Sequence, residues 1–261
     1  MNIIVCIKQV PNVSKVKIDP ITGTLIREGV DGIINPNDKN AIEEALVLRE
    51  KHGGEVTAIT MGPPQAEEAL REALAMGADK AILLCDRAFA GSDTLATSCT
   101  LSTAIKKSGR FDLIICGTEA TDGMTAHIGP QVAECLQLPQ VTYTRKVEVD
   151  GNVLRAERKI EDGYELVETL LPALITVARE ANEPRIAPID GIMEAFEMEI
   201  VVWHAGDLDV DKDQIGLAGS PTQIIKSAPA VLKRGEGQIL SGPVNEQVTA
   251  LIKKLSERQL I

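Results

Sequence analysis

Residues Phe111–Leu138 read FDLIICGTEATDGMTAHIGPQVAECLQL, and this stretch decides the fold. Its first part, Asp112–Cys116, is a short apolar run of the kind that forms a buried strand of a parallel sheet. Gly117–Thr125 then supplies turn-forming and hydrogen-bonding residues, and Ala126–Leu138 returns to the apolar periodicity of a helix. The stretch therefore predicts a strand, a polar loop and a helix in succession.

The loop in this stretch has the chemistry of an anion site. A helix leaves its first backbone N–H groups unpaired and carries partial positive charge at that end, so a phosphate can bind there. Gly117 and Gly123 would let a ligand approach the backbone. Thr125 is placed to be the N-cap, and Pro130 falls in the first turn, where a missing N–H costs little. Further hydroxyls come from Thr118 and Thr121. Because any doubly wound domain contains such loops, an ordinary connecting loop remains the alternative.

Composition and charge limit the classes of protein to which the chain can belong. Of its 261 residues 44% are hydrophobic and 2% aromatic, so aliphatic side chains must fill the core and aromatic platforms for bases are nearly absent. The net charge of -11 repels phosphate backbones, so we expect no nucleic-acid partner. No apolar run approaches the ~20 residues that span a bilayer, and Met1–Val5 enters a strand without a basic leader. We expect a cytoplasmic protein without a membrane segment.

The cysteines and histidines form no metal motif. The five cysteines are scattered singly, without a C-x-x-C pair, and the three histidines lie far from one another in sequence. We therefore expect no metal site, and we expect the cysteines to be buried free thiols. They are Cys6, Cys85, Cys99, Cys116 and Cys135.

Strand and helix patterns alternate through the first half of the chain. The expected strands are Asn2–Val10, Glu55–Met61, Lys80–Cys85 and Asp112–Cys116. We expect four helices. The first has Asp38 as its cap and ends at His52, and the second is Gln65–Met76. The third is capped by Ser92–Thr94 and ends near Lys107, and the fourth is Ala126–Leu138. This alternation predicts an α/β fold with a doubly wound, mostly parallel sheet, which binds ligands at the carboxyl ends of its strands.

Several polar loops should meet at that edge of the sheet. They are Lys8–Pro11, Asn35–Asp38, Met61–Gly62, Ser92–Thr94 and Gly117–Thr125. Their convergence favours a nucleotide site. Neither G-x-G-x-x-G after the first strand nor G-x-x-x-x-G-K-[ST] occurs, which argues against an ordinary dinucleotide fold or a P-loop.

Hairpin patterns and a less regular tail follow. Lys15–Asp19 and Thr24–Arg27 predict a small hairpin, and Val141–Val149 with Val153–Ile160 predict a longer one about Asp150-Gly151. The strand pattern resumes at Tyr164–Leu171 and Leu174–Val177. After Asn182-Glu-Pro184 the chain becomes less regular, with a short strand at Ile200–Trp203 and one convincing helix, Asn245–Arg258. We therefore divide the chain into a nucleotide-binding α/β domain, 1–182, with a hairpin extension, and a C-terminal arm, 183–261. The arm either wraps a partner or is an irregular covering layer.

Motifs along nearly the whole chain resemble the beta subunits of electron transfer flavoproteins. The residues that carry the resemblance are Val5–Val10, Asn35-Pro36 with Ala41–Ala45, Met61–Pro63, Ala73–Asp79, Gly117-x-x-Ala120-x-Asp122-Gly123, Gly129-Pro130, Asn182–Arg185 and Gly216–Pro221. The resemblance implies an adenine nucleotide alpha hydrolase-like fold and a heterodimer with an alpha subunit that carries FAD.

The same resemblance implies an adenine nucleotide in this chain. Members that only pass electrons hold AMP, whereas members that bifurcate electrons hold a second FAD, which NADH reduces. Asp86–Thr97 is similar to the bifurcating group, so FAD is expected, with AMP as the alternative. In that case NADH is the transient donor, and the electrons go to ferredoxin and, through the alpha FAD, to an acyl-CoA or 2-hydroxy acid dehydrogenase that uses flavin. The redox chemistry belongs to the cofactor, so no catalytic side chain is expected.

The resemblance also assigns cofactor-binding residues by position. Asp122 is expected to meet ribose or loop amides, and Gly123, Thr125 and Ala126 to lie against phosphate. Glu119, Met124 and His127 depart from the usual residues of the family. The full expected set is Cys6, Lys8, Asn35, Pro36, Asn37, Asp38, Met61, Gly62, Thr94, Gly117, Thr118, Glu119, Ala120, Thr121, Asp122, Gly123, Met124, Thr125, Ala126, His127 and Ile128.

Pro188–Met193 matches the partner-docking loop of that family. Ile189 takes the anchoring apolar position, with Ile192 and Met193 beside it. Some relatives continue with lysines, whereas this chain continues with the acidic Glu194–Glu199, which suggests a different partner. A stand-alone ATP-binding or ATP-hydrolysing domain is the alternative from another class, and the lack of a lysine-bearing phosphate loop argues against it.

Overall fold

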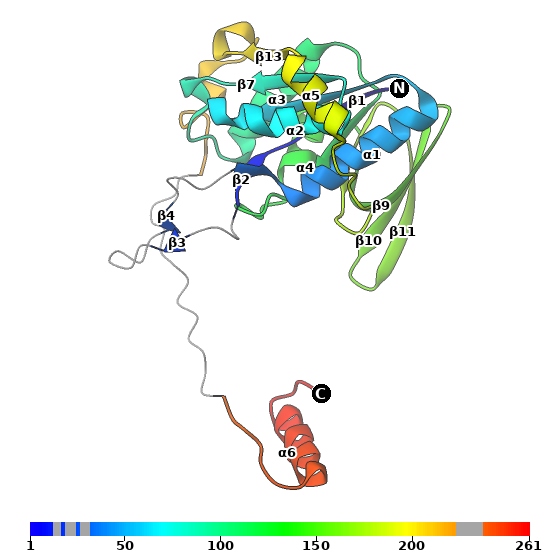
Figure 1. Ribbon diagram of the computed structural model, residues 1–261, viewed down its shortest axis with the longest axis vertical. Coiled ribbons are helices and arrows are strands. Elements are labelled where there is room, and N and C mark those ends of the chain that lie inside the picture. The colour runs from blue at the N-terminus through cyan, green and yellow to red at the C-terminus, as the bar shows by residue number, and fades with distance from the viewer. Residues whose placement is uncertain (13–16, 19–24, 27–31, 223–236) are drawn as a thin grey trace. The chain divides into compact units, whose positions relative to one another are not determined.

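The computed structural model describes residues 1–12, 17–18, 25–26, 32–222 and 237–261. Contacts divide the chain into two compact units, Met1–Ile225 and Lys226–Ile261. The first unit is an α/β domain, and the second contains helix α6 (Val244–Glu257) (Figure 1). In the described part of the chain, no helix is long and apolar enough to cross a membrane.

The first unit is built on a sheet of nine strands in the order β11-β10-β9-β12-β8-β1-β6-β7-β13. The strands from β9 through β12, β8, β1, β6 and β7 to β13 are parallel, and β10 is antiparallel to both β9 and β11. Their bounds are β1 (Asn2–Cys6), β6 (Glu55–Met61), β7 (Lys80–Leu84), β8 (Leu113–Gly117), β9 (Gln140–Asp150), β10 (Val153–Ile160), β11 (Gly163–Leu170), β12 (Ala173–Val177) and β13 (Ile200–Trp203). The predicted mostly parallel sheet is confirmed.

Helices cover both faces of the sheet. On one face α1 (Pro36–His52) and α2 (Glu67–Met76) enclose a core with Ile3, Val5, Leu113 and Ile115, and α5 (Ile189–Glu197) packs on α2. On the other face α3 (Thr94–Ser108) and α4 (Ile128–Leu136) cover the alternate side chains of the same strands, such as Ile4 and Ile114. Strands buried on both sides explain the continuous apolar runs in the sequence.

The strand order creates a switch point between β1 and β8. From β1 the chain moves outward to β6 and β7, then returns across the sheet through α3 to form β8 on the other side of β1. The loops after β1 and β8 therefore lead to opposite sides of the sheet, and open α/β sheets bind ligands at such a switch point, outside the carboxyl ends of the strands.

Smaller elements complete the first unit. Strands β2 (Gln9–Pro11) and β5 (Gly32–Ile34) pair with each other. In the expected small hairpin β3 (Lys17–Ile18) and β4 (Leu25–Ile26) pair antiparallel, and its turn lies outside the described residues. Short 3-10 turns occupy Pro64–Ala66, Arg87–Phe89, Ala205–Asp207 and Lys212–Gln214.

Two expectations about local structure were wrong. The segment expected to be a docking loop forms the helix α5, which begins at Ile189. The N-cap residue of α1 is Asn35, which makes no side-chain capping bond, and Pro36 is the first helical residue; Asp38 lies buried in the first turn. A proline at the first helical position suits a start at residue 36, because its fixed φ fits the helix and its missing N–H is not needed there.

Candidate functional site

Asp38 joins three segments at the switch point. Its carboxylate accepts a hydrogen bond of 2.8 Å from the Lys8 backbone N–H, just after β1, and interacts with the backbone of Gly117 at the end of β8 and with the Asn35 side chain. The residue is only 6% exposed. The first turn of α1 is thereby fixed to both strands that border the switch point.

Two asparagines fasten the loop that follows β8. The side-chain amides of Asn35 and Asn37 donate to the Glu119 carbonyl oxygen at 2.8 and 2.9 Å. The Asn35 side-chain oxygen in turn accepts from the backbone N–H of Thr121 at 3.1 Å. Asn35 is fully buried, so these bonds satisfy a side chain that would otherwise be costly to bury. The loop is therefore held against the start of α1 in one conformation.

Gly117 is needed for this close approach. A Cβ atom at its position would lie 2.3 Å from Oδ1 of Asp38 and 2.7 Å from the backbone carbon of Asn37. Gly123 is different, because a Cβ atom there would have no neighbour within 4 Å. Gly117 therefore serves the packing of the loop against α1, whereas the space beside Gly123 is open to a ligand.

Lys8 and Asp122 form an ion pair across the switch point. The Lys8 ammonium lies 2.7 and 2.6 Å from the two carboxylate oxygens of Asp122, and both side chains are partly exposed. The pair links the end of β1 to the loop after β8 and places a cation at the rim of the site.

Ionisable groups are buried beneath the switch point. Burial raises the pKa of Asp38 to about 7, against hydrogen bonds from Asn35, Lys8 and Gly117 that favour its charged form. Cys6 and Cys116 are neighbours in register on β1 and β8. A hydrogen bond with the Cys6 thiol, together with burial, raises the pKa of Cys116 well above its usual value. Near pH 7 the Cys116 thiol is therefore uncharged, whereas Asp38 is about half ionised.

The start of α4 leaves backbone donors for a ligand. The N-cap is His127, and it makes no side-chain capping bond, so the expectation that Thr125 is the cap was wrong. Met124 and Ala126 adopt left-handed backbone conformations with φ of 47 and 54, which delay the helix. Pro130 lies in the first turn, as predicted. A helix start without a side-chain cap is suited to a phosphate group.

The remaining expected site residues occupy the same edge of the sheet but differ in their contacts. Met61 ends β6, Gly62 donates its N–H to the Leu84 carbonyl, and Thr94 begins α3 behind its cap Asp93. The Thr118 hydroxyl donates to the Val177 carbonyl at 2.9 Å, so it serves the sheet. Ala120 and Ile128 lie in the loop and at the start of α4.

The thiol expectation holds for two of the five cysteines. All five are free, and Cys6 and Cys116 are buried, but Cys85, Cys99 and Cys135 are partly exposed. The sequence around a cysteine shows whether it lies in an apolar strand or helix, but not whether a neighbouring element covers its side chain.

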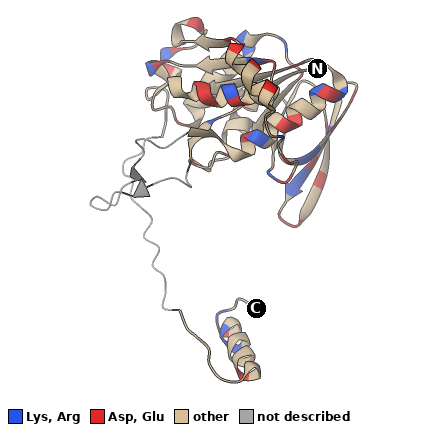
Figure 2. Cartoon of the chain, viewed as in Figure 1, with Lys and Arg blue, Asp and Glu red and all other residues tan. Residues whose placement is uncertain are grey.

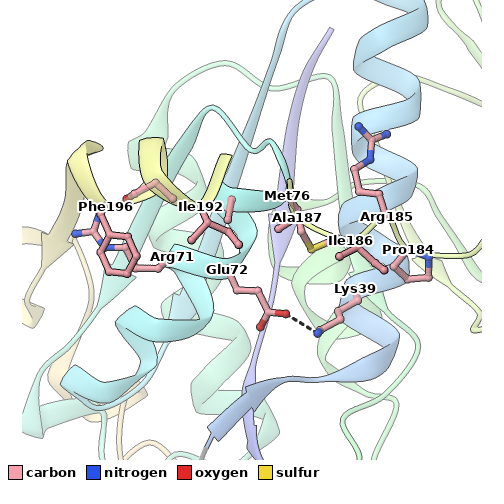
Figure 3. A pocket seen from close by; sticks show the side chains of 12 residues that line it. Lys39, Arg71, Glu72, Met76, Pro184, Arg185, Ile186, Ala187, Ile192 and Phe196 are labelled. Atoms are coloured by element: carbon pink, nitrogen blue, oxygen red, sulfur yellow. Dashed lines mark hydrogen bonds and ion pairs between the residues drawn. The ribbon is translucent and has the colours of Figure 1, made fainter. Parts of the chain in front are cut away.

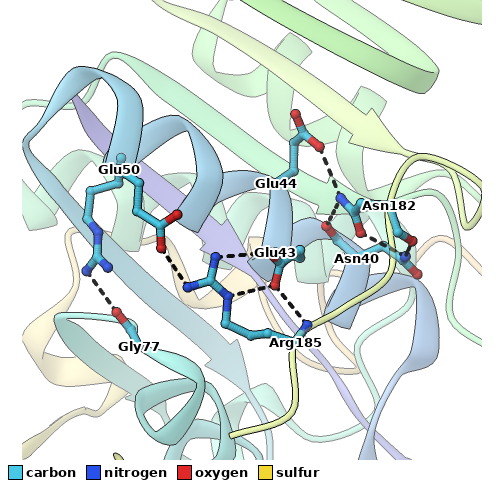
Figure 4. A network of polar contacts seen from close by, with 8 residues as sticks. Asn40, Glu43, Glu44, Glu50, Gly77, Asn182 and Arg185 are labelled. Atoms are coloured by element: carbon cyan, nitrogen blue, oxygen red, sulfur yellow. Dashed lines mark hydrogen bonds and ion pairs between the residues drawn. The ribbon is translucent and has the colours of Figure 1, made fainter. Parts of the chain in front are cut away.

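A polar network that sequence reasoning did not identify ties 182–185 to α1 (Figure 4). Arg185 donates to Glu43 at 2.9 Å and to Glu50 at 2.6 Å, and these carboxylates raise its pKa. The Asn182 amide donates to Glu44 at 3.0 Å and accepts from Asn40 at 3.0 Å. The signal in the sequence was the pair of glutamates on the buried side of α1, since buried carboxylates need partners.

A hollow of about 490 Å³ lies away from the switch point, between α1, α2 and the segment 184–196 (Figure 3). Its lining includes Met76, Ile186, Ile192 and Phe196, together with Lys39, which pairs with Glu72 at 2.5 Å. Its position beside α5 separates it from the switch point at β1 and β8.

Comparisons with known proteins agree with this architecture. Residues 22–208 match the family described as "Electron transfer flavoprotein domain". The chain is 54% identical to the electron transfer flavoprotein subunit beta of Clostridium acetobutylicum over 100% of both chains. It is 48% identical to the Caffeyl-CoA reductase-Etf complex subunit CarD of Acetobacterium woodii and 46% identical to the Acryloyl-CoA reductase electron transfer subunit gamma of Anaerotignum propionicum, each over 100% of both chains.

Proposed function

The chain belongs to the electron transfer flavoprotein family as a beta subunit, and on that premise we propose that its switch-point site binds FAD and takes part in electron bifurcation. The observation that carries the proposal is the loop after β8, which Asn35 and Asn37 hold against the start of α1 and which leads into a helix start without a side-chain cap. A phosphate-bearing cofactor satisfies the donors that such a loop presents.

The residues at this edge fit the adenylate part of FAD. Gly123, Thr125 and Ala126 would lie against the phosphates, because the space beside Gly123 is open and the N–H groups at the start of α4 lack a side-chain cap. Lys8 and Asp122 pair with each other at the rim, so Lys8 would face the phosphates as a cation once Asp122 turns to the ribose or the loop amides. Glu119 is held through its backbone carbonyl, which leaves its carboxylate free to point away from the phosphates.

When bound, FAD would supply the redox chemistry, accepting hydride from NADH and passing electrons to ferredoxin and to the FAD of the alpha subunit. The chain itself would bind and orient the cofactor, and none of its side chains need act as acid or base. Asp38 would hold the loops at the switch point in place through its bonds to Lys8 and Gly117.

The segment before α3 supports FAD rather than AMP. Asp86 accepts from the N–H groups of Ala88 and Ala205, and the N–H of Asp93 donates to the Ser220 hydroxyl at 2.8 Å. These bonds fix the positions of Asp86 and Asp93 in the segment that follows β7, and a fixed segment at this edge would suit the larger cofactor. One relative is named as a subunit of a caffeyl-CoA reductase-Etf complex, and another as an electron transfer subunit of acryloyl-CoA reductase. AMP as a structural nucleotide is the second candidate, and it follows from the same adenylate fit.

Partner contacts belong to the same proposal. We assign docking of a flavin-dependent dehydrogenase, of the acyl-CoA or 2-hydroxy acid class, to Ile189, Ile192 and Met193, which are 76%, 43% and 67% exposed. The apolar stripe of α6, which includes Val244, Val248, Leu251 and Ile252, would pack on the alpha subunit as part of the arm 183–261.

Anaerobic titration of the complex of this chain with its alpha subunit tests the proposal. With NADH as the only donor, we expect the visible absorbance of the flavin to bleach, and we expect ferredoxin to be reduced only when a dehydrogenase and its acceptor are also present. If NADH leaves the flavin spectrum unchanged in a fully loaded complex, this chain is not the NADH-reducible subunit and the AMP alternative is favoured.

A further inference from the structure

Two of the partly exposed cysteines lie side by side on neighbouring helices. Cys99 is in the first half of α3 and Cys135 is in the last turn of α4, and both are free thiols. One of these thiols donates a hydrogen bond to the other. We call the two residues the thiol pair. The proposed cofactor site does not use it, because both cysteines lie beyond the helix starts that border the switch point.

Helices α3 and α4 pack directly on each other around the thiol pair (Figure 1). The Ser98 hydroxyl, next to Cys99, donates to the side-chain oxygen of Gln131 on α4 at 3.2 Å. Most side chains of Thr94–Ala104 are small, so the two helices can approach closely. A disulfide requires two Cα atoms within about 7 Å of each other, and closely packed helices meet this requirement where two cysteines face each other.

Both helices are fixed to the sheet near their starts. Asp93 caps α3 by accepting from the N–H groups of Leu95 and Ala96 at 3.0 and 3.1 Å. A Cβ atom on Gly129 would lie 2.4 Å from Cγ2 of Thr176, so α4 is in close contact with β12. The two thiols are therefore held together by the fold. Groups held in contact react with each other far faster than with groups free in solution.

Exposure distinguishes the thiol pair from the other pair of neighbouring cysteines. The thiols of Cys6 and Cys116 are also hydrogen bonded, but these residues are only 6% and 4% exposed beneath the switch point. Cys99 and Cys135 are partly exposed, so a small oxidant can reach them from solvent. The oxidation of a cysteine depends on such exposure and on the fraction of its thiolate form.

The close approach of the two thiols controls their ionisation. Burial raises the pKa of Cys99, and the neighbouring Cys135 thiol raises it further. Two adjacent thiols do not readily ionise together, so one keeps its proton when the other becomes a thiolate. Because the thiolate is the reactive form, the pair should react slowly at neutral pH and faster as the pH rises.

We propose that Cys99 and Cys135 form a site of reversible oxidation, at which hydrogen peroxide converts the two thiols into a disulfide that joins α3 to α4. One thiolate attacks a peroxide oxygen, the O–O bond breaks, and hydroxide leaves a sulfenic acid behind. The other thiol then attacks this sulfur, so that the S–S bond forms, the S–O bond breaks and water leaves. Overall the two thiols lose two electrons and two protons, and the peroxide becomes two water molecules. The site is separate from the proposed cofactor function and does not depend on which nucleotide the chain holds.

Peroxide treatment of the complex with the alpha subunit, followed by peptide mass spectrometry, tests this site. The complex is reduced, freed of reductant and treated with hydrogen peroxide, and the remaining thiols are alkylated before digestion with trypsin. Trypsin releases Cys99 in peptide 88–106 and Cys135 in peptide 111–145, which also contains Cys116, so fragmentation must assign the linked residue. We expect a link between Cys99 and Cys135 that forms faster as the pH is raised and that dithiothreitol reverses.

Single substitutions test whether one thiol captures the oxidised form of the other. Cys135→Ser should abolish the link and leave Cys99 as a sulfenic acid, which dimedone labels. In the wild type this labelling should be at least about tenfold lower, because Cys135 removes the sulfenic acid within the protein. Cys85→Ser, the control, removes another partly exposed thiol and should leave the link unchanged. If Cys135→Ser lowers the yield of folded complex, Cys99→Ser exchanges the two roles and should give labelled Cys135.

Three outcomes overturn the inference. The first is that both cysteines stay reduced at a peroxide dose that oxidises glutathione in a parallel sample. The second is that Cys99 links to Cys116 or to a cysteine of the alpha subunit instead of Cys135. The third is equal dimedone labelling of Cys99 in the wild type and in Cys135→Ser.

Discussion

The Lys8 ammonium contacts both carboxylate oxygens of Asp122, at 2.7 and 2.6 Å, across the switch point between β1 and β8. The two residues are far apart in the sequence and belong to loops that leave the sheet in opposite directions. The contact brings a cation and a carboxylate to the switch point where an adenylate cofactor would bind.

Replacing Asp122 with alanine should loosen the nucleotide without unfolding the sheet. Exposed ion pairs contribute about 0–1 kcal/mol to stability, so the midpoint of thermal unfolding should hardly move. The Kd for nucleotide should rise about tenfold if the carboxylate meets the ribose or the loop amides. Asp162→Ala, in an exposed turn, is the control. Unchanged cofactor content in the Asp122 variant would remove this residue from the site.

The two loop glycines should respond differently to alanine. Gly117→Ala puts a methyl group 2.3 Å from Asp38 Oδ1, so the helix start must shift, and we expect a loss of about 1–3 kcal/mol in unfolding free energy together with loss of nucleotide. Gly123→Ala meets no atom within 4 Å, so its unfolding free energy should stay within about 0.5 kcal/mol of wild type. Urea unfolding and nucleotide titration of both variants measure this. Retained binding in Gly123→Ala would mean that phosphate does not approach that glycine.

Asp38 should make stability depend on pH. Its pKa is raised by burial from 3.8 to about 7 in the folded protein, so between these values the folded state binds more protons than the unfolded state. Unfolding free energy should therefore fall as pH rises from about 4 to about 7. Asp38→Asn cannot ionise and should lose this part of the dependence, as urea titrations at several pH values would show. If the unfolding free energy changes equally with pH in the wild type and in Asp38→Asn, the pKa of Asp38 is not raised.

Removing Arg185 should release the segment that leads to α5. Arg185→Ala leaves Glu43 buried, with a side chain only 10% exposed and no cation, and we expect a loss of roughly 3 kcal/mol in unfolding free energy. Hydrogen exchange of 183–198 should become faster. Arg155→Ala breaks an exposed pair with Glu168 on the β10–β11 ribbon and should cost less than about 1 kcal/mol. If both substitutions lower the unfolding free energy by the same amount, the Arg185 ion pairs stabilise the fold no more than an exposed surface pair does.

The sequence predicted the elements well where local chemistry decides them. The Ser92–Thr94 cap was correct, since Asp93 accepts from the N–H groups of Leu95 and Ala96. The β9–β10 hairpin about Asp150-Gly151 is confirmed, because Gly151 takes the positive φ that the turn needs. The convergence of loops from β1, β8 and α1 at one edge is also confirmed.

Expectations were wrong where contacts between distant residues decide the structure. The apolar periodicity of Ala126–Leu138 suggested a cap at Thr125, but Met124 and Ala126 are left-handed and the helix begins at Ile128. Helix α5 has Pro188 as N-cap and no side-chain cap, and Arg71 of α2 binds its last carbonyls. The segment nevertheless carries a helical pattern that the loop expectation missed, because Ile189, Ile192, Met193 and Phe196 recur at i, i+3, i+4 and i+7.

The content of flavin in the complex with the alpha subunit tests the central claim most directly. The complex is reconstituted with excess FAD, freed of unbound nucleotide and denatured, and the released nucleotides are identified and counted. We predict two FAD molecules per heterodimer, one of them held at the β1–β8 switch point of this chain. One FAD together with one AMP, or one FAD alone, would contradict the proposal that this subunit carries its own redox cofactor.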